Sequence, residues 1–546
     1  MRVLLTTFNS SYIHKNLALR WLYVARPKDV VVNISEYTIK DDVSSVAASI
    51  IADNYDVVGI SVYIWNVDQV KSLIQLLKLR KPTIKIVLGG PEVTYENDEW
   101  FAYPIDAIVL GEGERVFWEY LINNNTDYVK EEASEFKPVR KEDIAYLESL
   151  DIPYNLEIDH TNFSNQYLYV EASRGCPFRC SYCLSSLDNT VRFFSLEYLE
   201  NLFESVKDFP INQVKFLDRT FNAHKERTKA LYKMLENYPN IESFQVEIVA
   251  DRLDDDLIEM IINKSNRDRY RYEIGIQSYN PKTLEAVDRR QDNERLNQVM
   301  RILLDNDITI HADLIAGLPY EGLTSFQASF NQLANVYPTE LQLGILKLLK
   351  GTKMKDQALK LNFLYNLQAP YEVYDTPWLN KSEMDYINIV AKGVDRTLNR
   401  NLLEVTVKYL NEHHYAGDLF TLYYEIGQVF ERIGIGYQKY DLFMELYELL
   451  KNKIDKDILK SLLTIDYWMG EKQKAKILFF EENMRQIQQL IVEKGYFDQN
   501  QVYRYARVFK DYRYNNTYIF ALYNDQQTES SIYSIDFKED TCQKIS

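Results

Sequence analysis

Three cysteines, Cys176, Cys180 and Cys183, lie close together in the run Ser173-Arg-Gly-Cys-Pro-Phe-Arg-Cys-Ser-Tyr-Cys183. The chain has only four cysteines in 546 residues, so the grouping is a specific feature of this segment. Disulfide scaffolds spread their cysteines along the chain, whereas clustered cysteines bind metal or carry out redox chemistry. Thiolates are the usual ligands of iron–sulfur clusters, and this spacing lets one short loop supply three of them.

A loop with three cysteines leaves one iron of a four-iron cluster without a protein ligand. An open coordination position is what a reactive metal centre needs, in contrast to a closed structural site. One alternative is a zinc site, which would need a fourth ligand such as Cys542 or one of the six histidines. The other alternative is inert buried thiols, which would have no reason to cluster. The spacing favours the iron–sulfur interpretation over both.

The cysteine run follows a predicted strand at Leu168–Glu171, which opens a series of alternating strands and helices. Further strands are predicted at Gln213–Leu217, Phe244–Val249, Arg271–Ile276, Thr309–Leu314 and Leu341–Leu346. Six strand–helix units in a row predict an open, partial (β/α)6 barrel over residues 166–360. The working face of such a barrel lies at the carboxyl ends of its strands, so the cysteine loop is expected at that face.

Residues 1–125 show a separate alternation of strands and helices. The predicted strands are Val3–Phe8, Val30–Ile34, Val57–Val62, Ile84–Leu88 and Ala107–Leu110, and the predicted helices include Leu17–Ala25, Val43–Ala52 and Val67–Leu79. Several of these strands are almost entirely apolar, as expected when helices cover both faces of a parallel sheet. The pattern predicts a doubly wound α/β domain with its ligand beyond the carboxyl ends of the strands. No Gly-x-Gly-x-x-Gly follows the first strand, which disfavours a dinucleotide.

The rest of the chain is organised less distinctly. Residues 126–165 are polar and charged and are interpreted as a partly packed linker. Beyond residue 360 the strand signal fades, and apolar residues recur at helical spacing, so residues 361–546 are predicted to form a mostly helical domain. A short strand-like tail follows at Tyr518–Tyr523 and Ser531–Phe537.

Composition limits the classes of partner and the compartment. The chain has 63 Lys and Arg against 80 Asp and Glu, a formal net charge of −17, which disfavours binding to nucleic acid or to an anionic membrane. No signal peptide is recognised at the amino terminus, and no apolar run is long enough for a transmembrane helix. We therefore expect a cytoplasmic protein without nucleic-acid or membrane partners.

The spacing Cys-x-x-x-Cys-x-x-Cys after the first strand of a barrel resembles the radical S-adenosylmethionine (SAM) superfamily. The resemblance implies that Cys176, Cys180 and Cys183 hold a 4Fe–4S cluster whose fourth iron chelates SAM. It also implies that one electron from the cluster cleaves SAM to methionine and a 5′-deoxyadenosyl radical. The cofactor carries the difficult chemistry, and the protein positions the reacting atoms.

Polar residues at the ends of the barrel strands are the expected contacts for SAM. Asp218, which follows the second strand, resembles the acidic residue that accepts hydrogen bonds from the SAM ammonium group in this superfamily. The full set of expected SAM-binding residues is Asp218, Glu247, Glu273, Gln277 and Asp313. Because an unpaired buried carboxylate is costly, the alternative is that Glu247, Glu273 and Asp313 form ion pairs with Arg or Lys inside the barrel.

A doubly wound domain directly before such a barrel resembles the cobalamin-binding class of the superfamily, and this resemblance covers residues 1 to about 350. It places the corrin against the loops after the strands. The expected cobalamin contacts are Ser61, Tyr63, Trp65, Gly89, Gly90, Glu92, Gly111, Glu112 and His14. The cobalamin signature Asp-x-His-x-x-Gly is incomplete, because Tyr12 and Leu17 replace the Asp and Gly around His14. We therefore expect His14 to be a loop contact and not a ligand of cobalt.

Three functions follow from the resemblance. The first is a cobalamin-dependent radical SAM enzyme that methylates an unactivated carbon of an unknown small molecule or peptide, with flavodoxin or ferredoxin as electron donor. The second keeps both cofactors but performs an oxidation, ring closure or rearrangement without methyl transfer. The third is a non-catalytic iron–sulfur and cobalamin sensor. The carboxyl-terminal part resembles a domain of unknown function found in a bacterial subgroup, and it gives no activity.

Overall fold

The computed structural model describes residues 1–546 apart from 155–162, 189, 470–477, 480–483, 525–529 and 546. By its internal contacts the chain divides into two compact units. The first comprises Met1–Gly322 and Gly344–Asn380, and the second comprises Leu323–Leu343 and Lys381–Ser546. Among the described residues, no helix combines the length and the apolar character needed to cross a bilayer.

The first unit begins with a six-stranded sheet in the order β2-β1-β3-β4-β5-β6. Its strands are β1 (Arg2–Asn9), β2 (Val31–Thr38), β3 (Val57–Ser61), β4 (Lys85–Gly89), β5 (Ala107–Val109) and β6 (Val129–Lys130). The pairs from β2 to β5 are parallel, and only β6 runs antiparallel, against β5. β6 lies in the segment predicted as a linker, so part of that segment packs against the sheet.

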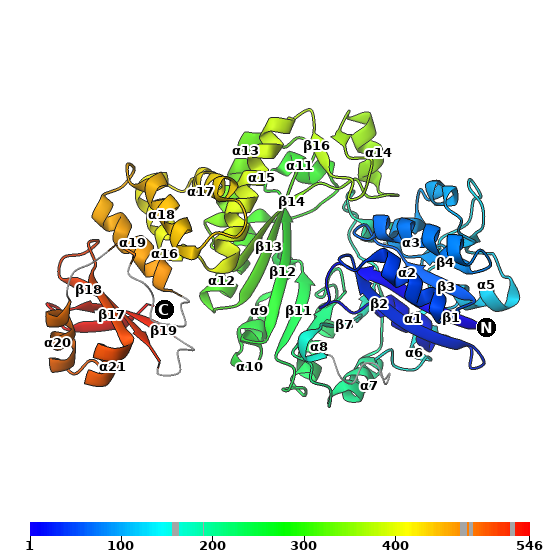
Figure 1. The fold of residues 1–546 in the computed structure, drawn as a ribbon, viewed down its shortest axis with the longest axis horizontal. Coiled ribbons are helices and arrows are strands. Elements are labelled where there is room, and N and C mark those ends of the chain that lie inside the picture. Colours follow the sequence, from blue (N-terminus) through cyan, green and yellow to red (C-terminus); the bar gives the residue numbers. More distant parts are fainter. Residues whose placement is uncertain (155–162, 189, 470–477, 480–483, 525–529, 546) are drawn as a thin grey trace. The chain divides into compact units, whose positions relative to one another are not determined.

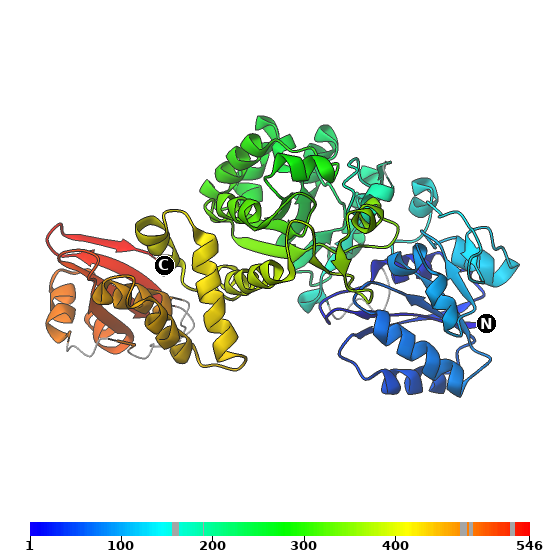
Figure 2. The same cartoon turned by 90° about the horizontal axis from the view of Figure 1, so that it is seen from above.

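Helices cover both faces of this sheet, as the apolar strands predicted (Figures 1 and 2). They are α1 (Leu17–Val24), α2 (Val43–Ala52), α3 (Val67–Arg80) and α5 (Val116–Asn123). α2 and α3 contribute to one buried apolar cluster with Leu4 and Ile60 of the strands. α1 and α5 contribute to a second cluster with Val3 and Leu5. Alternate residues of β1 thus enter different clusters, because successive side chains of a strand point to opposite faces.

A second six-stranded sheet follows, in the order β14-β13-β12-β11-β10-β7. Its strands are β7 (Leu168–Val170), β10 (Gln213–Phe216), β11 (Ser243–Ile248), β12 (Tyr270–Gln277), β13 (Thr309–Ala316) and β14 (Glu340–Ile345). The four pairs from β7 to β13 are parallel. β7 and β14 are the two edges, so the sheet is the open, partial barrel that the sequence predicted.

The barrel strands alternate strictly between buried and half-buried residues, most clearly in β11, β12 and β13. The buried residues are aliphatic or aromatic, and they face the helices that connect the strands. These helices are α7 (Leu196–Val206), α8 (Lys225–Leu235), α9 (Asp255–Ile262), α10 (Lys264–Arg267), α11 (Pro281–Ala286) and α12 (Asn293–Asp305), whereas α13 (Leu323–Ala334) belongs to the second unit. The half-buried residues are largely polar, and they line the inner side of the barrel.

The cysteine run lies between β8 (Ser173–Arg174) and β9 (Arg192–Phe193), which pair as a short antiparallel ribbon. This ribbon closes the base of the cysteine loop. Because β8 directly follows β7, the loop emerges at the carboxyl end of the first barrel strand, where the sequence placed it. The first unit ends with α14 (Lys353–Lys360) and the two short strands β15 (Leu364–Tyr365) and β16 (Val373–Asp375).

The second unit contains helices and an antiparallel sheet. Beyond residue 380 the helices are α15 (Lys381–Arg396), α16 (Glu404–Leu410), α17 (Leu419–Ile433), α18 (Lys439–Leu450), α19 (Lys456–Trp468), α20 (Arg485–Glu493) and α21 (Gln499–Tyr505). The strands β17 (Ala506–Lys510), β18 (Thr517–Tyr523), β19 (Ser530–Asp536) and β20 (Thr541–Lys544) pair in chain order. The mostly helical character agrees with the prediction, and the expected strand-like tail is a complete four-stranded sheet.

Candidate functional site

The three predicted cluster ligands share one loop and act on one another electrostatically. Cys176 and Cys180 are buried, and Cys183 is half-buried. Burial raises the pKa of the Cys176 thiol, and the neighbouring Cys183 and Cys180 raise it further. Metal coordination overcomes such a raised pKa, because a coordinating thiol is deprotonated outright. The donor set, three thiols on one loop, therefore fits an iron–sulfur cluster.

The geometry is less suited to a single metal ion. Within the described part of the chain, no three His, Cys, Asp or Glu side chains converge closely enough to hold one ion. A zinc site needs such convergence on one point. A four-iron cluster attaches each cysteine to a different iron, so its ligands stand further apart. The structure therefore gives the zinc alternative no support.

The backbone of the cysteine loop is held at several points. Gly175 has a φ of +90°, and a Cβ at this position would approach the Thr190 carbonyl oxygen to 2.2 Å. The Cys176 amide donates to the Asp188 carbonyl at 3.0 Å. Further along, the Ser181 amide donates to Val287, and the Ser181 carbonyl accepts from Met354, both at 2.9 Å. The loop is thus fixed at its base and beside Cys180.

Arg289, which the sequence did not single out, contacts the cysteine loop. Its Nη1 lies 3.8 Å from the Cys180 sulfur and 3.5 Å from the Tyr182 hydroxyl, and its Nη2 donates to the Gly275 carbonyl. The guanidinium is therefore a cation directly against a predicted cluster ligand. Arg289 follows α11 in a polar segment, and its spacing from the cysteines carries no local signal that could have identified it.

Asp218, the expected contact for the SAM ammonium group, is only 3% exposed. Its Oδ2 accepts from the Ala172 amide at 2.8 Å, and its Oδ1 accepts from the Ser173 hydroxyl at 2.5 Å. Burial raises the pKa of Asp218 to about 7, against the lowering effect of these two hydrogen bonds. Both oxygens are thus engaged with the segment that leads into the cysteine loop. The structure gives Asp218 a positioning role, and its contact with SAM stays a prediction.

The other expected SAM-binding carboxylates line the inner side of the barrel, each with a polar partner. Glu247 pairs with Arg219 at 3.2 Å, and Glu273 pairs with Lys215 at 3.0 Å. These are the ion pairs that the sequence raised as the alternative to SAM contact. Among the described residues, Asp313 pairs with His311 on the same strand, at 3.0 Å, and not with an Arg or Lys as that alternative supposed.

Gln277, the remaining expected SAM-binding residue, ends β12 where the pairing with β13 is irregular. Its backbone has a φ of +69°, which is uncommon for a residue other than glycine. Its Oε1 is buried and has no hydrogen-bond partner among the described residues. Strained backbone and an unpartnered buried oxygen are features that a ligand would explain, and they single out Gln277 within the predicted set.

The expected cobalamin contacts lie on the loops that follow the strands of the first sheet. Gly90 has a φ of +104°, and a Cβ there would approach the Val62 carbonyl oxygen to 2.6 Å. A Cβ on Gly89 would meet no atom within 4 Å, so this loop has open space above it. Tyr63 and Trp65 stack with ring centroids 4.5 Å apart and planes 4° apart, and Trp65 is 44% exposed. Ser61 is buried at the end of β3. Open space at the loop after β4 and an exposed aromatic face on the loop after β3 each suit a planar ligand.

Glu112 and Glu92 are occupied by basic partners in the barrel part of the first unit. Glu112 pairs with Arg174 at 2.8 Å and also with Arg192, and it follows Gly111, whose φ is +88°. Glu92 pairs with Lys350 at 2.9 Å and accepts from the Tyr371 hydroxyl. Buried carboxylates need such partners. Their predicted contacts with cobalamin stay predictions, and the structure gives both residues a role in holding the two domains together.

His14 also faces the barrel. Its Nδ1 lies 2.6 Å from the Tyr169 hydroxyl on β7. Burial lowers the pKa of His14, and the charge of Lys215 lowers it further, so both favour the neutral form of the ring. The side chain acts as a hydrogen-bonding loop residue, in the way that the incomplete signature led us to expect. Its contact with cobalamin stays a prediction.

Models of three protein families match successive parts of the chain. The B12 binding domain matches residues 4–121, the radical SAM superfamily matches residues 170–333, and a protein family of unknown function, DUF4080, matches residues 360–535. The predicted cofactors, cobalamin, SAM and a 4Fe–4S cluster, are confirmed at the level of these domain families.

Two curated relatives are named as methyltransferases. The 2-(S-pantetheinyl)-carbapenam-3-carboxylate methyltransferase of Streptantibioticus cattleyicolor is 26% identical over 54% of this chain and 46% of its own length. The cobalamin-dependent radical SAM methyltransferase TokK of Streptomyces tokunonensis is 27% identical over 53% of this chain and 47% of its own length. The chain thus spans about half the length of the curated relatives it matches.

Solved structures extend the likeness in fold. The radical SAM methyltransferase TsrM from Kitasatospora setae, with cobalamin and a 4Fe–4S cluster bound, aligns with a TM-score of 0.54 at 16% identity, covering 68% of this chain and 76% of that one. The cobalamin-dependent SAM radical enzyme OxsB with aqua-cobalamin bound aligns with a TM-score of 0.59 at 14% identity, covering 85% of this chain and 79% of that one. The chain therefore carries, in this order, a B12-binding domain, a radical SAM domain and a DUF4080 domain.

Proposed function

We propose that this chain is a cobalamin-dependent radical SAM enzyme that methylates an unactivated carbon of a substrate not yet identified. One observation carries the proposal. Three mutually interacting cysteines lie on a loop at the carboxyl end of the first barrel strand, and that loop is fastened to the B12-binding domain by ion pairs. The names of the two curated relatives, both methyltransferases, support the reaction type.

When bound, the cluster would supply the electron that cleaves SAM, and cobalamin would supply a carrier for the methyl group. Cys176, Cys180 and Cys183 would hold the cluster. Arg289 would place a positive charge against the Cys180 sulfur, which favours the thiolate. The substrate would be a small molecule or a peptide, and a flavodoxin or ferredoxin would deliver the electron.

The polar inner side of the barrel would receive SAM. Gln277 offers a buried oxygen that accepts no hydrogen bond from the described residues, so a ligand hydroxyl or ammonium group would satisfy it. Glu247 of β11 and Asp313 of β13 lie on strands that flank β12, and both keep part of their side chains exposed. If hydrogen bonds to a ligand replaced these ion pairs, each carboxylate would still have the polar partner that it needs.

The carboxyl ends of β3 and β4 would receive the corrin. The open space at Gly89 lets a ligand approach the backbone closely, and the positive φ of Gly90 makes the turn there possible without a Cβ clash. The stacked pair of Tyr63 and Trp65 would support a planar group, because an exposed aromatic face gains from burial against it. Ser61 and Gly111 would supply further contacts to the corrin at this edge of the sheet.

A second function, radical chemistry with cobalamin but without methyl transfer, is favoured by one observation. OxsB with aqua-cobalamin and SAM bound covers 91% of this chain, a larger share than the methyltransferase TsrM covers, and its description names no methyl transfer. The two functions differ in their products. Methyl transfer from SAM releases S-adenosylhomocysteine, whereas SAM cleavage alone releases 5′-deoxyadenosine and methionine.

The test is anaerobic reconstitution of the full chain with iron, sulfide and hydroxocobalamin, followed by addition of SAM and dithionite. We expect about one 4Fe–4S cluster per chain and release of 5′-deoxyadenosine. The triple variant Cys176→Ala, Cys180→Ala, Cys183→Ala should lose both, and Cys542→Ala, which removes the one cysteine outside the loop, should keep both. A cluster retained in the triple variant would contradict the proposal.

A further inference from the structure

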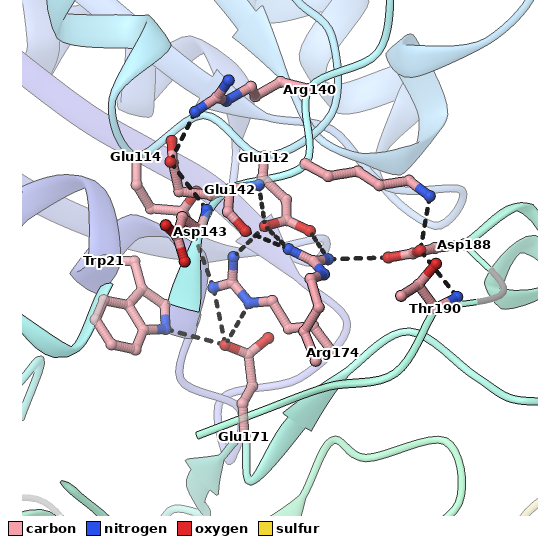
Figure 3. Close-up of polar contacts among 12 residues, drawn as sticks. Trp21, Glu112, Glu114, Arg140, Glu142, Asp143, Glu171, Arg174, Asp188 and Thr190 are labelled. Atoms are coloured by element: carbon pink, nitrogen blue, oxygen red, sulfur yellow. Dashed lines mark hydrogen bonds and ion pairs between the residues drawn. The ribbon is translucent and has the colours of Figure 1, made fainter. Parts of the chain in front are cut away.

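The contact between the B12-binding domain and the cysteine loop is a network of ion pairs. We call it the clamp and define it by four residues: Glu112 and Glu114 from the loop between β5 and α5, and Arg174 and Arg192 from the β8–β9 ribbon. Figure 3 shows Arg174 extending toward Glu112 and Glu114 from the base of the cysteine loop. The sequence alone does not predict the clamp, and it predicts Glu112 as a cobalamin contact.

Arg174 is the centre of the clamp. Its Nη1 lies 2.8 Å from Glu112 Oε2, and its Nη2 lies 2.8 Å from Glu114 Oε1. The same guanidinium is held from the barrel side by Glu171 at 2.9 Å, and Glu171 accepts from the Trp21 indole of α1 at 3.1 Å (Figure 3). The Arg174 side chain is only 10% exposed, so these ion pairs are screened little by solvent.

Arg192, on the second strand of the ribbon, also forms an ion pair with Glu112. It pairs opposite Arg174 across β8 and β9, and its Nη1 lies 3.1 Å from Glu112 Oε2. Its Nη2 lies 2.9 Å from Asp188, whose carbonyl accepts the Cys176 amide. Glu112 thus forms ion pairs with both strands of the ribbon. Asp188 connects the clamp to Cys176, the first predicted cluster ligand.

Few residues separate the clamp from either predicted cofactor site. Arg174 precedes Cys176 by two residues, with Gly175 in a positive-φ turn between them. On the other side, Glu112 follows Gly111 at the end of β5, in the row of loops expected to meet the corrin. The two Nη atoms of Arg174 pair with different glutamates, and because arginine donors form a planar fork this fixes direction as well as distance. A shift of either loop would therefore break several ion pairs at once.

We propose that Glu112 and Arg174 are positioning residues that fix the cysteine loop relative to the B12-binding domain, and so fix the separation between the cluster and cobalt. The inference rests on the proposed function, because it requires both groups to bind to this chain. It goes beyond it by giving Glu112 a role through Arg174 and not through contact with cobalamin. Such a residue sets the distance and orientation between the two bound cofactors. It does not change how much of either cofactor binds.

The test measures that geometry directly. The full chain is loaded anaerobically with a 4Fe–4S cluster and hydroxocobalamin and is then reduced, which makes both the cluster and the cobalt paramagnetic. Electron paramagnetic resonance then reports their spin–spin coupling. We expect one well-defined coupling in the unaltered chain. In Glu112→Gln, which is isosteric but uncharged, we expect loss of that single value and a broad distribution, with iron and cobalamin contents unchanged.

Two further variants make the result decisive. Lys78→Met removes an ion pair of equal length, 2.8 Å to Asp106, that lies wholly within the B12-binding domain, and it should leave the coupling unchanged. If Glu112→Gln fails to load either cofactor, Arg192→Lys is measured in its place, since it keeps the charge but removes the fork. A coupling that stays sharp in the measured clamp variant overturns the positioning role. A chain that loads neither cofactor in unaltered form overturns the proposed function itself.

Discussion

At the scale of single residues, the backbone conformation of Gly175 allows the cysteine loop to fold back onto its base. Its φ of +90° costs an L-residue about 1–2 kcal/mol, and a Cβ would lie 2.2 Å from the Thr190 carbonyl oxygen. We expect Gly175→Ala to lose most of the iron bound after anaerobic reconstitution. Gly495→Ala is the matched control, because Gly495 also has a positive φ, +73°, but a Cβ there meets nothing within 4 Å. Equal iron contents in the two variants would contradict this account of the loop.

Asp218 gives a pH-dependent prediction. Its pKa of about 7 in the folded chain lies above its ordinary value of 3.8, so the folded state binds the proton more tightly than the unfolded chain does. Stability should therefore fall as pH rises from about 4 to about 7 and then level off, by a few kcal/mol at most. Asp218→Asn cannot titrate and should lack this decline. The unfolding temperatures of both proteins, measured at several pH values, give the comparison, and parallel curves would show that the buried carboxyl does not titrate in this range.

At the scale of secondary-structure elements, two glycines let α15 and α17 pack backbone against backbone. A Cβ on Gly427 would lie 2.1 Å from the Ile389 carbonyl oxygen, and one on Gly393 would lie 2.2 Å from the Tyr423 carbonyl oxygen. Overpacking of this kind costs about 1–3 kcal/mol, whereas replacing a helical glycine by alanine gains about 1 kcal/mol of helix propensity. We expect the overpacking to dominate.

The variant Gly427→Ala should therefore lower the unfolding temperature, measured by circular dichroism, while leaving the iron content unchanged. Gln428→Ala, the next residue on the same helix, gains helix propensity without filling the contact and should not be destabilised to the same extent. A more stable Gly427→Ala protein would mean that the helices separate easily and that the close approach has little energetic weight.

Elements with a strong local pattern could be predicted from the sequence. The helix Val43–Ala52 is found with the predicted bounds, since its apolar spacing is clear and Asp42 caps its first turn. By contrast, β6 has only two residues and exists through its pairing with β5, so it leaves no periodic signal. β17 was missed because Ala506–Lys510 directly continues α21 and is extended only by pairing with β18.

The same distinction applies to the site. The three cysteines could be predicted as cluster ligands because their spacing is local to one loop. The partners of Glu112 and Glu92 could not be predicted, because Arg174 and Lys350 lie 62 and 258 residues further along the chain. An acidic residue at the ligand edge of a sheet indicates a ligand contact when the rest of the fold is unknown. Tertiary packing also gives both carboxylates basic partners from the barrel, and these partners leave no local signal.

At the scale of the whole molecule, the first unit unites two domains through contacts on separate loops of the B12-binding domain. The clamp engages the loop after β5, and Lys350 engages the loop after β4 through Glu92 at 2.9 Å and Glu99 at 2.7 Å. The Lys350 and Glu92 side chains are each only 6% exposed. Two separated points of attachment resist rotation of one domain against the other more effectively than either point alone.

Lys350→Met tests the second point of attachment. It leaves Glu92 buried without its cation, and removal of one partner of a buried ion pair costs about 3–5 kcal/mol. We expect a lower unfolding temperature by calorimetry and partial recovery in the double variant Lys350→Met, Glu92→Gln, where the stranded charge is also removed. Lys408→Met breaks a surface ion pair with Glu404, in which both side chains are 48% exposed, and should change stability by less than about 1 kcal/mol. Additive effects in the double variant would show that Lys350 and Glu92 do not interact energetically, and the attachment of the two domains would then depend on the clamp.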